Sequence, residues 1–178
     1  MHQDCKKILI SEQQIVERCK QLGQKLSEKY QNNPRKVLFV GILKGSIPFM
    51  AELIKHVSID IEIDFIAASS YSGTESLGDI KIIKDLDCSI IDTDIVVIED
   101  IIDTGLTIKK IKELLYHKGA SNVKVVALLN KQSRRICDVQ ADYIGFEIEN
   151  EFVIGFGLDF NQRYRNLPYV GVLKEECY

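Results

Sequence analysis

Three short segments of this chain are almost wholly apolar, and they constrain its fold more than any other feature. They are the segments 37–40, 95–98 and 123–129. Because polar residues do not alternate with apolar ones, each segment is expected to be a strand that is covered on both faces. Buried strands of this kind are typical of parallel sheets, in which helices connect one strand to the next.

The segments around these runs carry the helices that a parallel sheet needs. From 11 to 30 apolar residues recur every three or four positions, with Ser11 as a plausible N-cap. Further helices are predicted at 47–56 and from Ile108 to a C-terminal Gly119. Further strands are predicted at 59–68, 80–83, 143–148, 152–156 and 169–173. The expected fold class is α/β, a mostly parallel twisted sheet with helices on both faces.

Length and composition narrow the classes of protein. The 178 residues suit one domain, 1–178, and 23 Lys+Arg against 26 Asp+Glu give a net charge of −3, which argues against nucleic-acid binding. The five cysteines form no CxxC pair, so neither a disulfide framework nor a zinc site is expected. No stretch approaches the roughly 20 apolar residues of a membrane span. We expect a cytoplasmic protein with reduced thiols and no membrane partner.

A cluster of acids follows the second apolar run. Glu99, Asp100 and Asp103 lie directly after the strand at 95–98. In a doubly wound sheet, ligands bind outside the carboxyl ends of the strands. A carboxylate pair suits two vicinal sugar hydroxyls, with a cation to offset the repulsion. The plainer alternative is that these acids are solvated surface residues.

A turn rich in Thr and Gly comes next and opens the following helix. Its members are Thr104, Gly105, Leu106 and Thr107. Free N–H groups at a helix N-terminus favour a phosphate, and Gly105 allows the backbone to approach it closely. Thr104 and Thr107 can add hydroxyl donors, although Thr104 could also simply cap the helix. No Walker A loop and no GxGxxG motif is present.

The segment Glu99–Gly105 resembles the phosphoribosyl-diphosphate signature of type I phosphoribosyltransferases, in the form found in the hypoxanthine-guanine enzymes. Four further segments resemble that family in the same order along the chain. They are Leu43-Lys44-Gly45 (diphosphate loop), Ser70-Tyr71 (start of a mobile lid, 69–79), Lys131 (base recognition) and the segment from Phe152 through Asp159 to Arg165, within a hood at 142–178.

The resemblance implies a purine-salvage reaction. A 6-oxopurine would attack C1 of 5-phosphoribosyl 1-diphosphate, giving a purine nucleoside monophosphate and diphosphate. Hypoxanthine, guanine and possibly xanthine are the bases implied. Mg²⁺ is implied as cofactor, and relatives form homodimers or homotetramers.

The resemblance also assigns roles to the acids. Asp103 corresponds to the acid–base residue at N7 of the purine, although taken alone it could cap the next helix. Glu99 and Asp100 correspond to the pair at the ribose hydroxyls and the first Mg²⁺. Asp159 corresponds to the ligand of a second Mg²⁺. Since Mg²⁺ keeps several waters, we expect these carboxylates to act largely through water or ribose rather than as a tight cage.

On the diphosphate side the resemblance implies a non-proline cis peptide at Leu43-Lys44-Gly45, with amides directed at the diphosphate. Lys44 has the alternative of a solvated loop lysine. Arg165 corresponds to a diphosphate contact, and Arg163, two residues away, is its rival. At Leu106 some relatives carry a polar or basic residue, but only its backbone amide is needed for phosphate.

On the base side, Lys131 corresponds to the donor to the exocyclic oxygen at position 6, which would select against adenine. Phe152 corresponds to the ring that stacks on the purine, and the backbone of Val153 to a contact with its pyrimidine edge. A solvated lysine and a core phenylalanine are the plain alternatives. Arg134 and Arg135 add positive potential nearby.

Two other functions fit parts of this pattern. One is a regulatory protein of the same fold that senses nucleotides, and the net charge of −3 disfavours those regulators that bind nucleic acid. The other is a phosphoribosyltransferase for a different base, which Lys131 with Phe152 disfavours.

Overall fold

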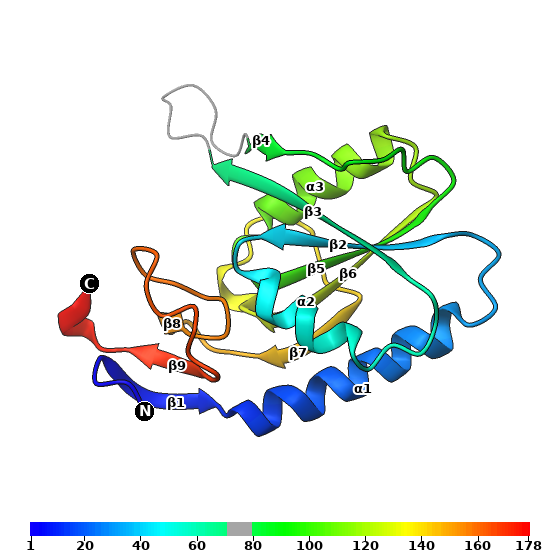
Figure 1. The fold of residues 1–178 in the computed structure, drawn as a ribbon. Coiled ribbons are helices and arrows are strands. Elements are labelled where there is room, and N and C mark those ends of the chain that lie inside the picture. Colours follow the sequence, from blue (N-terminus) through cyan, green and yellow to red (C-terminus); the bar gives the residue numbers. More distant parts are fainter. Residues whose placement is uncertain (71–79) are drawn as a thin grey trace.

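A computed structural model describes residues 1–70 and 80–178 and contains a six-stranded central sheet (Figure 1). The strand order is β4-β3-β2-β5-β6-β7, and every neighbouring pair is parallel except β3 with β4. The strands are β2 (Val37–Leu43), β3 (Glu62–Ser70), β4 (Ile80–Lys84), β5 (Asp94–Ile102), β6 (Asn122–Asn130) and β7 (Tyr143–Glu147). The prediction of a mostly parallel sheet is confirmed, and the three apolar runs are its adjacent central strands.

Helices cover both faces of this sheet, as predicted. α1 (Glu12–Tyr30) and α2 (Ser46–Ile54) lie on one face, and α3 (Leu106–His117) lies on the other (Figure 1). One buried cluster joins Leu26 and Phe49 of the first two helices to Val96 of β5. A second cluster joins Ile111 of α3 to Val97, the next residue along that strand. Burial on both faces explains why the strands lack polar alternation.

α1 begins where the sequence predicts. The Ser11 hydroxyl accepts a hydrogen bond from the Gln14 N–H at 3.3 Å, and the Ser11 N–H donates to Gln14 Oε1 at 2.9 Å. This reciprocal capping box satisfies two N–H groups that the helix leaves free. The predicted end of α3 is also confirmed, because Gly119 follows this helix with φ of 93°, in the left-handed region that favours glycine.

A second, three-stranded antiparallel sheet forms what we call the hood. Its order is β1-β9-β8, with β1 (Cys5–Ile10), β9 (Val170–Leu173) and β8 (Val153–Ile154). In Figure 1 the hood lies on the side to which β2 and β3 point. β1 was not predicted. The strand predicted at 152–156 is too long, because Gly155, Phe156 and Gly157 have φ of 94°, 47° and 98° and turn the chain away.

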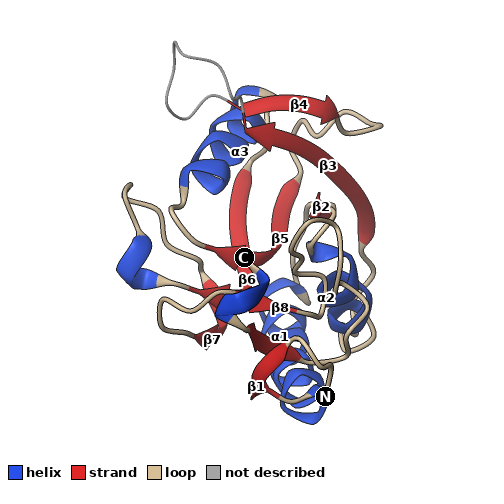
Figure 2. Cartoon of the chain, turned by 90° about the vertical axis from the view of Figure 1, so that its left-hand side faces the viewer, coloured by secondary structure: helices blue, strands red, loops and turns tan. Residues whose placement is uncertain are grey.

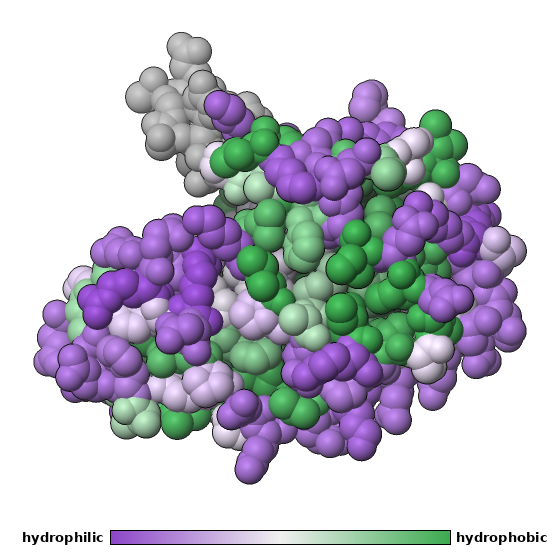
Figure 3. Space-filling model, in the orientation of Figure 1, coloured by the Kyte–Doolittle hydropathy of each residue, from purple (hydrophilic) through white to green (hydrophobic). Residues whose placement is uncertain are grey.

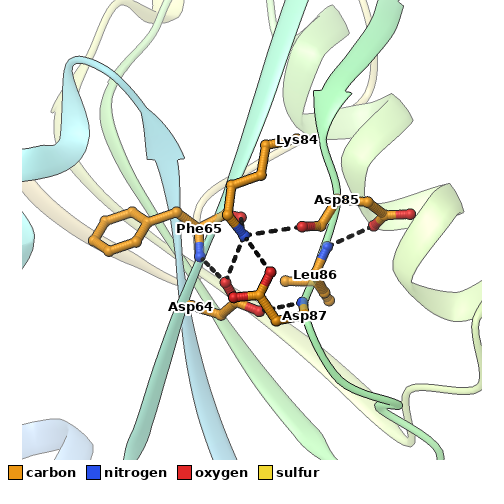
Figure 4. A network of polar contacts seen from close by, with 6 residues as sticks. All are labelled: Asp64, Phe65, Lys84, Asp85, Leu86 and Asp87. Atoms are coloured by element: carbon orange, nitrogen blue, oxygen red, sulfur yellow. Dashed lines mark hydrogen bonds and ion pairs between the residues drawn. The ribbon is translucent and has the colours of Figure 1, made fainter.

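The edge of the central sheet is fixed by a polar network (Figure 4). Lys84 Nζ lies 2.9 Å from Asp64 Oδ1 and donates to the Phe65 carbonyl at 3.0 Å. The Asp87 N–H donates to the other oxygen of Asp64 at 2.8 Å. These contacts join the turn after β4 to β3 and keep the antiparallel edge strand in place.

One face of the molecule is apolar at its centre. In Figure 3 hydrophobic residues gather where α2 and β3 run in Figure 1, with polar residues around them. Ile47 of α2 and Ile63 of β3 are 47% and 50% exposed there. Among the helices of residues 1–70 and 80–178, none has the length and apolar character needed to cross a membrane.

Candidate active site

A pocket of about 250 Å³ opens at the carboxyl ends of β5 and β6, next to the hood strand β8. Figure 2 views the molecule from the side on which the hood lies. The pocket is lined by Asp100, Ile101, Asp103, Lys131, Phe152, Val153, Leu158 and Asp159. Six of these were predicted as site residues, and they come from positions up to 59 residues apart in the sequence. The fold therefore brings the acids after β5 together with the lysine after β6 and the aromatic residue of the hood.

Of the paired acids, Glu99 is buried and Asp100 is half-buried. Glu99 is 8% exposed and its Oε2 has no hydrogen-bond partner among the described residues. Burial and the charge of Asp100 raise the pKa of Glu99 well above its ordinary value. Burial likewise raises the pKa of Asp100 to about 6, although the Ile101 N–H donates to its Oδ1 at 2.9 Å. Glu99 and Asp100 are therefore not solvated surface residues, whereas the side chain of Asp103 is 38% exposed.

We expect Glu99→Gln to stabilise the protein when no divalent cation is present. A raised folded-state pKa means that stability is lost as pH rises through it, because ionising Glu99 costs more folded than unfolded. Gln cannot ionise, so thermal unfolding of the variant at pH 8 should show a gain in stability over the wild type. At pH 5 the gain should be smaller. A gain that is equal at both values would contradict this account.

The diphosphate loop has the conformation that the resemblance implied. The Leu43–Lys44 peptide bond is cis, and Gly45 is the N-cap of α2. A Cβ atom on Gly45 would lie 1.6 Å from Asp100 Oδ2, so only glycine fits beside that carboxylate. A Cβ atom on Gly157 would lie 1.9 Å from the Gly45 carbonyl oxygen. This loop, the β5 acids and the segment after β8 therefore pack against one another.

Arg165, rather than Arg163, faces the site. Its Nη2 lies 2.8 Å from Asp159 Oδ1, and its Nη1 donates to the Gly157 carbonyl at 2.6 Å. Arg163 points to the hood instead, where its Nη2 lies 3.5 Å from Asp4 Oδ2 and its guanidinium lies over the Tyr164 ring. The geometry thus favours Arg165 as the diphosphate contact.

The phosphate turn lies at the start of α3. Gly105 is the N-cap, with φ of 87°, and Leu106 is the first helical residue. The cap has no side-chain hydrogen bond, so the alternative that Asp103 caps the helix is wrong. Thr104 Oγ1 accepts a bond from the Leu106 N–H at 3.4 Å, a weak form of the capping alternative. Thr107 lies in the first turn, where its N–H has no helical partner.

The residues that the resemblance assigns to the base, Lys131, Phe152 and Val153, line one pocket. Lys131 is 7% exposed, and burial lowers the pKa of its ammonium. It is not a solvated lysine. Its ammonium makes no hydrogen bond within residues 1–70 and 80–178, although it lines the pocket. Phe152 is 38% exposed, so it is not a core residue either. Val153, at the start of β8, lines the pocket beside it.

The lid prediction falls mostly outside the described residues. Ser70 is the last residue of β3, and the structure does not describe its side chain. Tyr71 and the rest of 71–79 lie outside the described residues. The carry-over of these two positions therefore stays a prediction.

Glu99, Asp100 and Asp159 can hold Mg²⁺ only if water or substrate supplies further ligands. Within the described residues no group of three or more potential ligand side chains could hold a metal ion. Asp159 is paired with Arg165, while Glu99 Oε2 is a buried acceptor without a donor. Oxygen donors that are too few for a cage suit Mg²⁺ held partly by water and substrate phosphates. Glu99, Asp100 and Asp159 thus fit the cofactor without enclosing it.

Sequence reasoning missed two residues that contact predicted site residues, Gln162 and Tyr178, and it did not show which residue Arg134 contacts. Gln162 Oε1 accepts from Lys44 Nζ and from Arg165 Nη2, each at 3.4 Å, and so connects these two cations. Tyr178 stacks on Phe152 with ring centroids 4.9 Å apart. Arg134 Nε lies 2.9 Å from Asp103 Oδ1. No pattern in the sequence predicts these pairs.

The mostly parallel sheet thus places the paired acids and the turn of α3 at the carboxyl ends of its strands, where open α/β sheets bind ligands. Residues 7–161 match the family model for the phosphoribosyl transferase domain. The chain belongs to the phosphoribosyltransferase family and has its type I fold.

Within the family it falls in the hypoxanthine-guanine branch. A hypoxanthine-guanine phosphoribosyltransferase of Lactococcus lactis is 55% identical over 174 residues, covering 97% of this chain and 93% of the relative. A hypoxanthine phosphoribosyltransferase structure from Staphylococcus aureus matches with a TM-score of 0.92 and 46% identity, over 100% of this chain and 98% of that one. One from Trypanosoma cruzi, in complex with the product IMP, matches with a TM-score of 0.94 and 31% identity, over 100% and 99%. The chain is therefore a purine-salvage enzyme that transfers a pentosyl group.

Proposed function

We propose that this chain transfers the 5-phosphoribosyl group from 5-phosphoribosyl 1-diphosphate to hypoxanthine or guanine, giving IMP or GMP and diphosphate. The observation that carries the proposal is one pocket that holds Asp103, the buried Lys131 and the half-exposed Phe152 together. An aromatic face, a cation and a carboxylate match the ring, the exocyclic oxygen and N7 of a 6-oxopurine. The sugar side continues into the acids of β5 and the turn of α3.

The reaction joins N9 of the purine to C1 of the ribose while the bond from C1 to the diphosphate oxygen breaks. The base loses a proton, and the pair of electrons of the broken bond leaves with the diphosphate. Asp103 is the carboxylate in reach of N7, where it takes that proton or returns it in the reverse direction. Asp103 lines the pocket, and its side chain is 38% exposed there.

Charge develops on both sides of the breaking bond. The ribose becomes partly positive, and the buried carboxylates of Glu99 and Asp100 stabilise it electrostatically. The leaving diphosphate is negative, and Lys44 and Arg165 lie on its side of the site. Mg²⁺, when bound, neutralises the phosphates. The amides and hydroxyls of residues 104–107 would hold the 5′-phosphate.

An assay with five bases tests the proposal. Guanine, hypoxanthine, xanthine, adenine and uracil are each supplied with 5-phosphoribosyl 1-diphosphate and Mg²⁺, and formation of the nucleotide is measured. We expect turnover of guanine and hypoxanthine. Turnover of adenine or uracil alone would contradict the choice of base, and no turnover at all would favour a regulatory protein of the same fold.

Lys131→Ala should impair the base side of the reaction selectively. Removing a buried donor to the exocyclic oxygen leaves that oxygen unpaired, so KM for hypoxanthine should rise about tenfold or more. KM for 5-phosphoribosyl 1-diphosphate should change by less than about twofold, since Lys131 lies beyond the sugar site. Steady-state kinetics with each substrate varied in turn measure both. Equal losses on both sides would contradict the assigned role.

The proposal also includes the compartment and the oligomeric state of the protein. All five cysteines are free, which supports a reducing compartment and hence the cytoplasm. We expect a homodimer or homotetramer in solution, which sedimentation measurements would detect.

A further inference from the structure

Two arginines that follow Lys131 contact Asp103, one at its backbone and the other at its carboxylate. Arg135 Nε donates to the Asp103 carbonyl at 3.2 Å, and its Nη2 bonds Asn130 Oδ1. It therefore fixes the backbone of the turn. Arg134 Nε instead lies 2.9 Å from the Asp103 carboxylate, at Oδ1. This contact is an ion pair without hydrogen-bond alignment, since Oδ1 has no hydrogen-bond partner among the described residues.

Arg134 and Lys131 stand at the two ends of one short turn beside the same carboxylate. Lys131 is the N-cap of the 3-10 turn η1 (Gln132–Arg134), and Arg134 is its last residue. Burial lowers the pKa of Lys131, the charge of Asp103 opposes that change, and the charge of Arg134 adds to it. Asp103 thus interacts electrostatically with both cations, and both could serve as its counter-ion.

The structure shows which cation pairs with Asp103. Arg134 is in ion-pair contact with it, while the Lys131 ammonium makes no ion pair with any described residue. An ammonium engaged by Asp103 would have to break that pair before it could donate to a purine oxygen. The carboxylate, drawn to Lys131, would also leave the position from which it reaches N7.

We propose that Arg134 is a positioning residue that holds the Asp103 carboxylate away from Lys131 and so leaves the lysine free to bind the base. This inference rests on the proposed function. Arg134 itself does not line the pocket, so it acts through the two residues that do. Because the contact is an unaligned ion pair, a lysine at this position should largely replace it.

A double-mutant cycle tests this role. In the wild-type background Arg134→Ala should raise KM for hypoxanthine about tenfold, because Asp103 would then pair with Lys131 and the base would lose the hydrogen bond from its ammonium. In the Lys131→Ala background the same change should raise it less than about twofold, because no ammonium remains to be captured. KM for 5-phosphoribosyl 1-diphosphate should stay within about twofold in every variant. Arg134→Lys should recover most of the loss.

Arg35→Ala is the matched control. Arg35 Nε also lies 2.9 Å from a carboxylate oxygen, Asp92 Oδ1, and its side chain is 43% exposed against 49% for Arg134. It lies far from the pocket residues in sequence and should leave both KM values unchanged. Arg134→Gln replaces the alanine variant in the cycle if that variant does not fold.

The same double-mutant cycle is repeated by measuring the affinity for IMP calorimetrically. Because IMP binding needs no turnover, this measurement tests the role of Arg134 separately from the proposed reaction. Binding should weaken with Arg134→Ala only where Lys131 is present. Equal weakening in both backgrounds would mean that Arg134 acts independently of Lys131 and would overturn the inference. So would a loss that Arg134→Lys does not restore. Absence of hypoxanthine turnover in the wild type would overturn the proposed function alone.

Discussion

Asp103→Asn should lower kcat by about 10²- to 10⁴-fold, the range that loss of a general base gives. Asn has nearly the same shape, and its side-chain oxygen can still face Arg134. What it cannot do is take a proton from N7 of the purine. Because the backbone of the turn is fixed by Arg135 through the Asp103 carbonyl, the phosphate site should survive the change.

The measurement separates chemistry from binding. Single-turnover rates give the chemical step, and calorimetry gives the affinity for 5-phosphoribosyl 1-diphosphate, which should change less than about threefold. Asp138→Asn is the control, because Asp138 is an exposed carboxylate in the loop after β6. If affinity falls as much as the rate, Asp103 serves the sugar phosphate and not the base.

The central strands could be predicted because strands that are buried on both faces consist almost wholly of apolar residues. β2, β5 and β6 are covered by α1 and α2 on one face and α3 on the other, and this leaves almost no position for a polar residue. β1 has no such apolar run over its whole length. Its sequence, CKKILI, has two lysines and pairs with β9 about 160 residues later, with Ile10 opposite Val170. Pairing over that distance has no local pattern.

The same distinction holds within the site. Glu99 to Thr107 are contiguous, so strand end, acids and turn could be predicted together. The loop around Gly45 could be predicted as a loop, but its conformation was inferred only from resemblance, because its glycine is required by contact with Asp100, 55 residues away. Arg134 was noticed as a charge near Lys131, but nothing in its position indicated that it faces Asp103. Contacts between side chains of separate loops depend on the folded backbone.

Removing divalent metal should abolish turnover, by about 1,000-fold or more, and added Mg²⁺ should restore it. The reason lies in the balance of charge. Of the three carboxylates that we propose for the metal and the sugar diphosphate, Asp100 and Asp159 line the pocket, and the buried Glu99 precedes Asp100. Of these only Asp159 has an ion-pair partner among the described residues, at 2.8 Å from Arg165 Nη2.

The raised pKa values of Glu99 and Asp100 have the same origin, since burial without a cation makes their charged forms costly. A bound cation would reverse that cost, so loss of metal should weaken substrate binding as well as turnover. Calorimetry with 5-phosphoribosyl 1-diphosphate should therefore detect much weaker binding in EDTA, whereas EDTA already saturated with Mg²⁺ should have no effect. Full activity in EDTA would mean that Lys44 and Arg165 alone neutralise the diphosphate. The buried acids would then have to act on the ribose unaided.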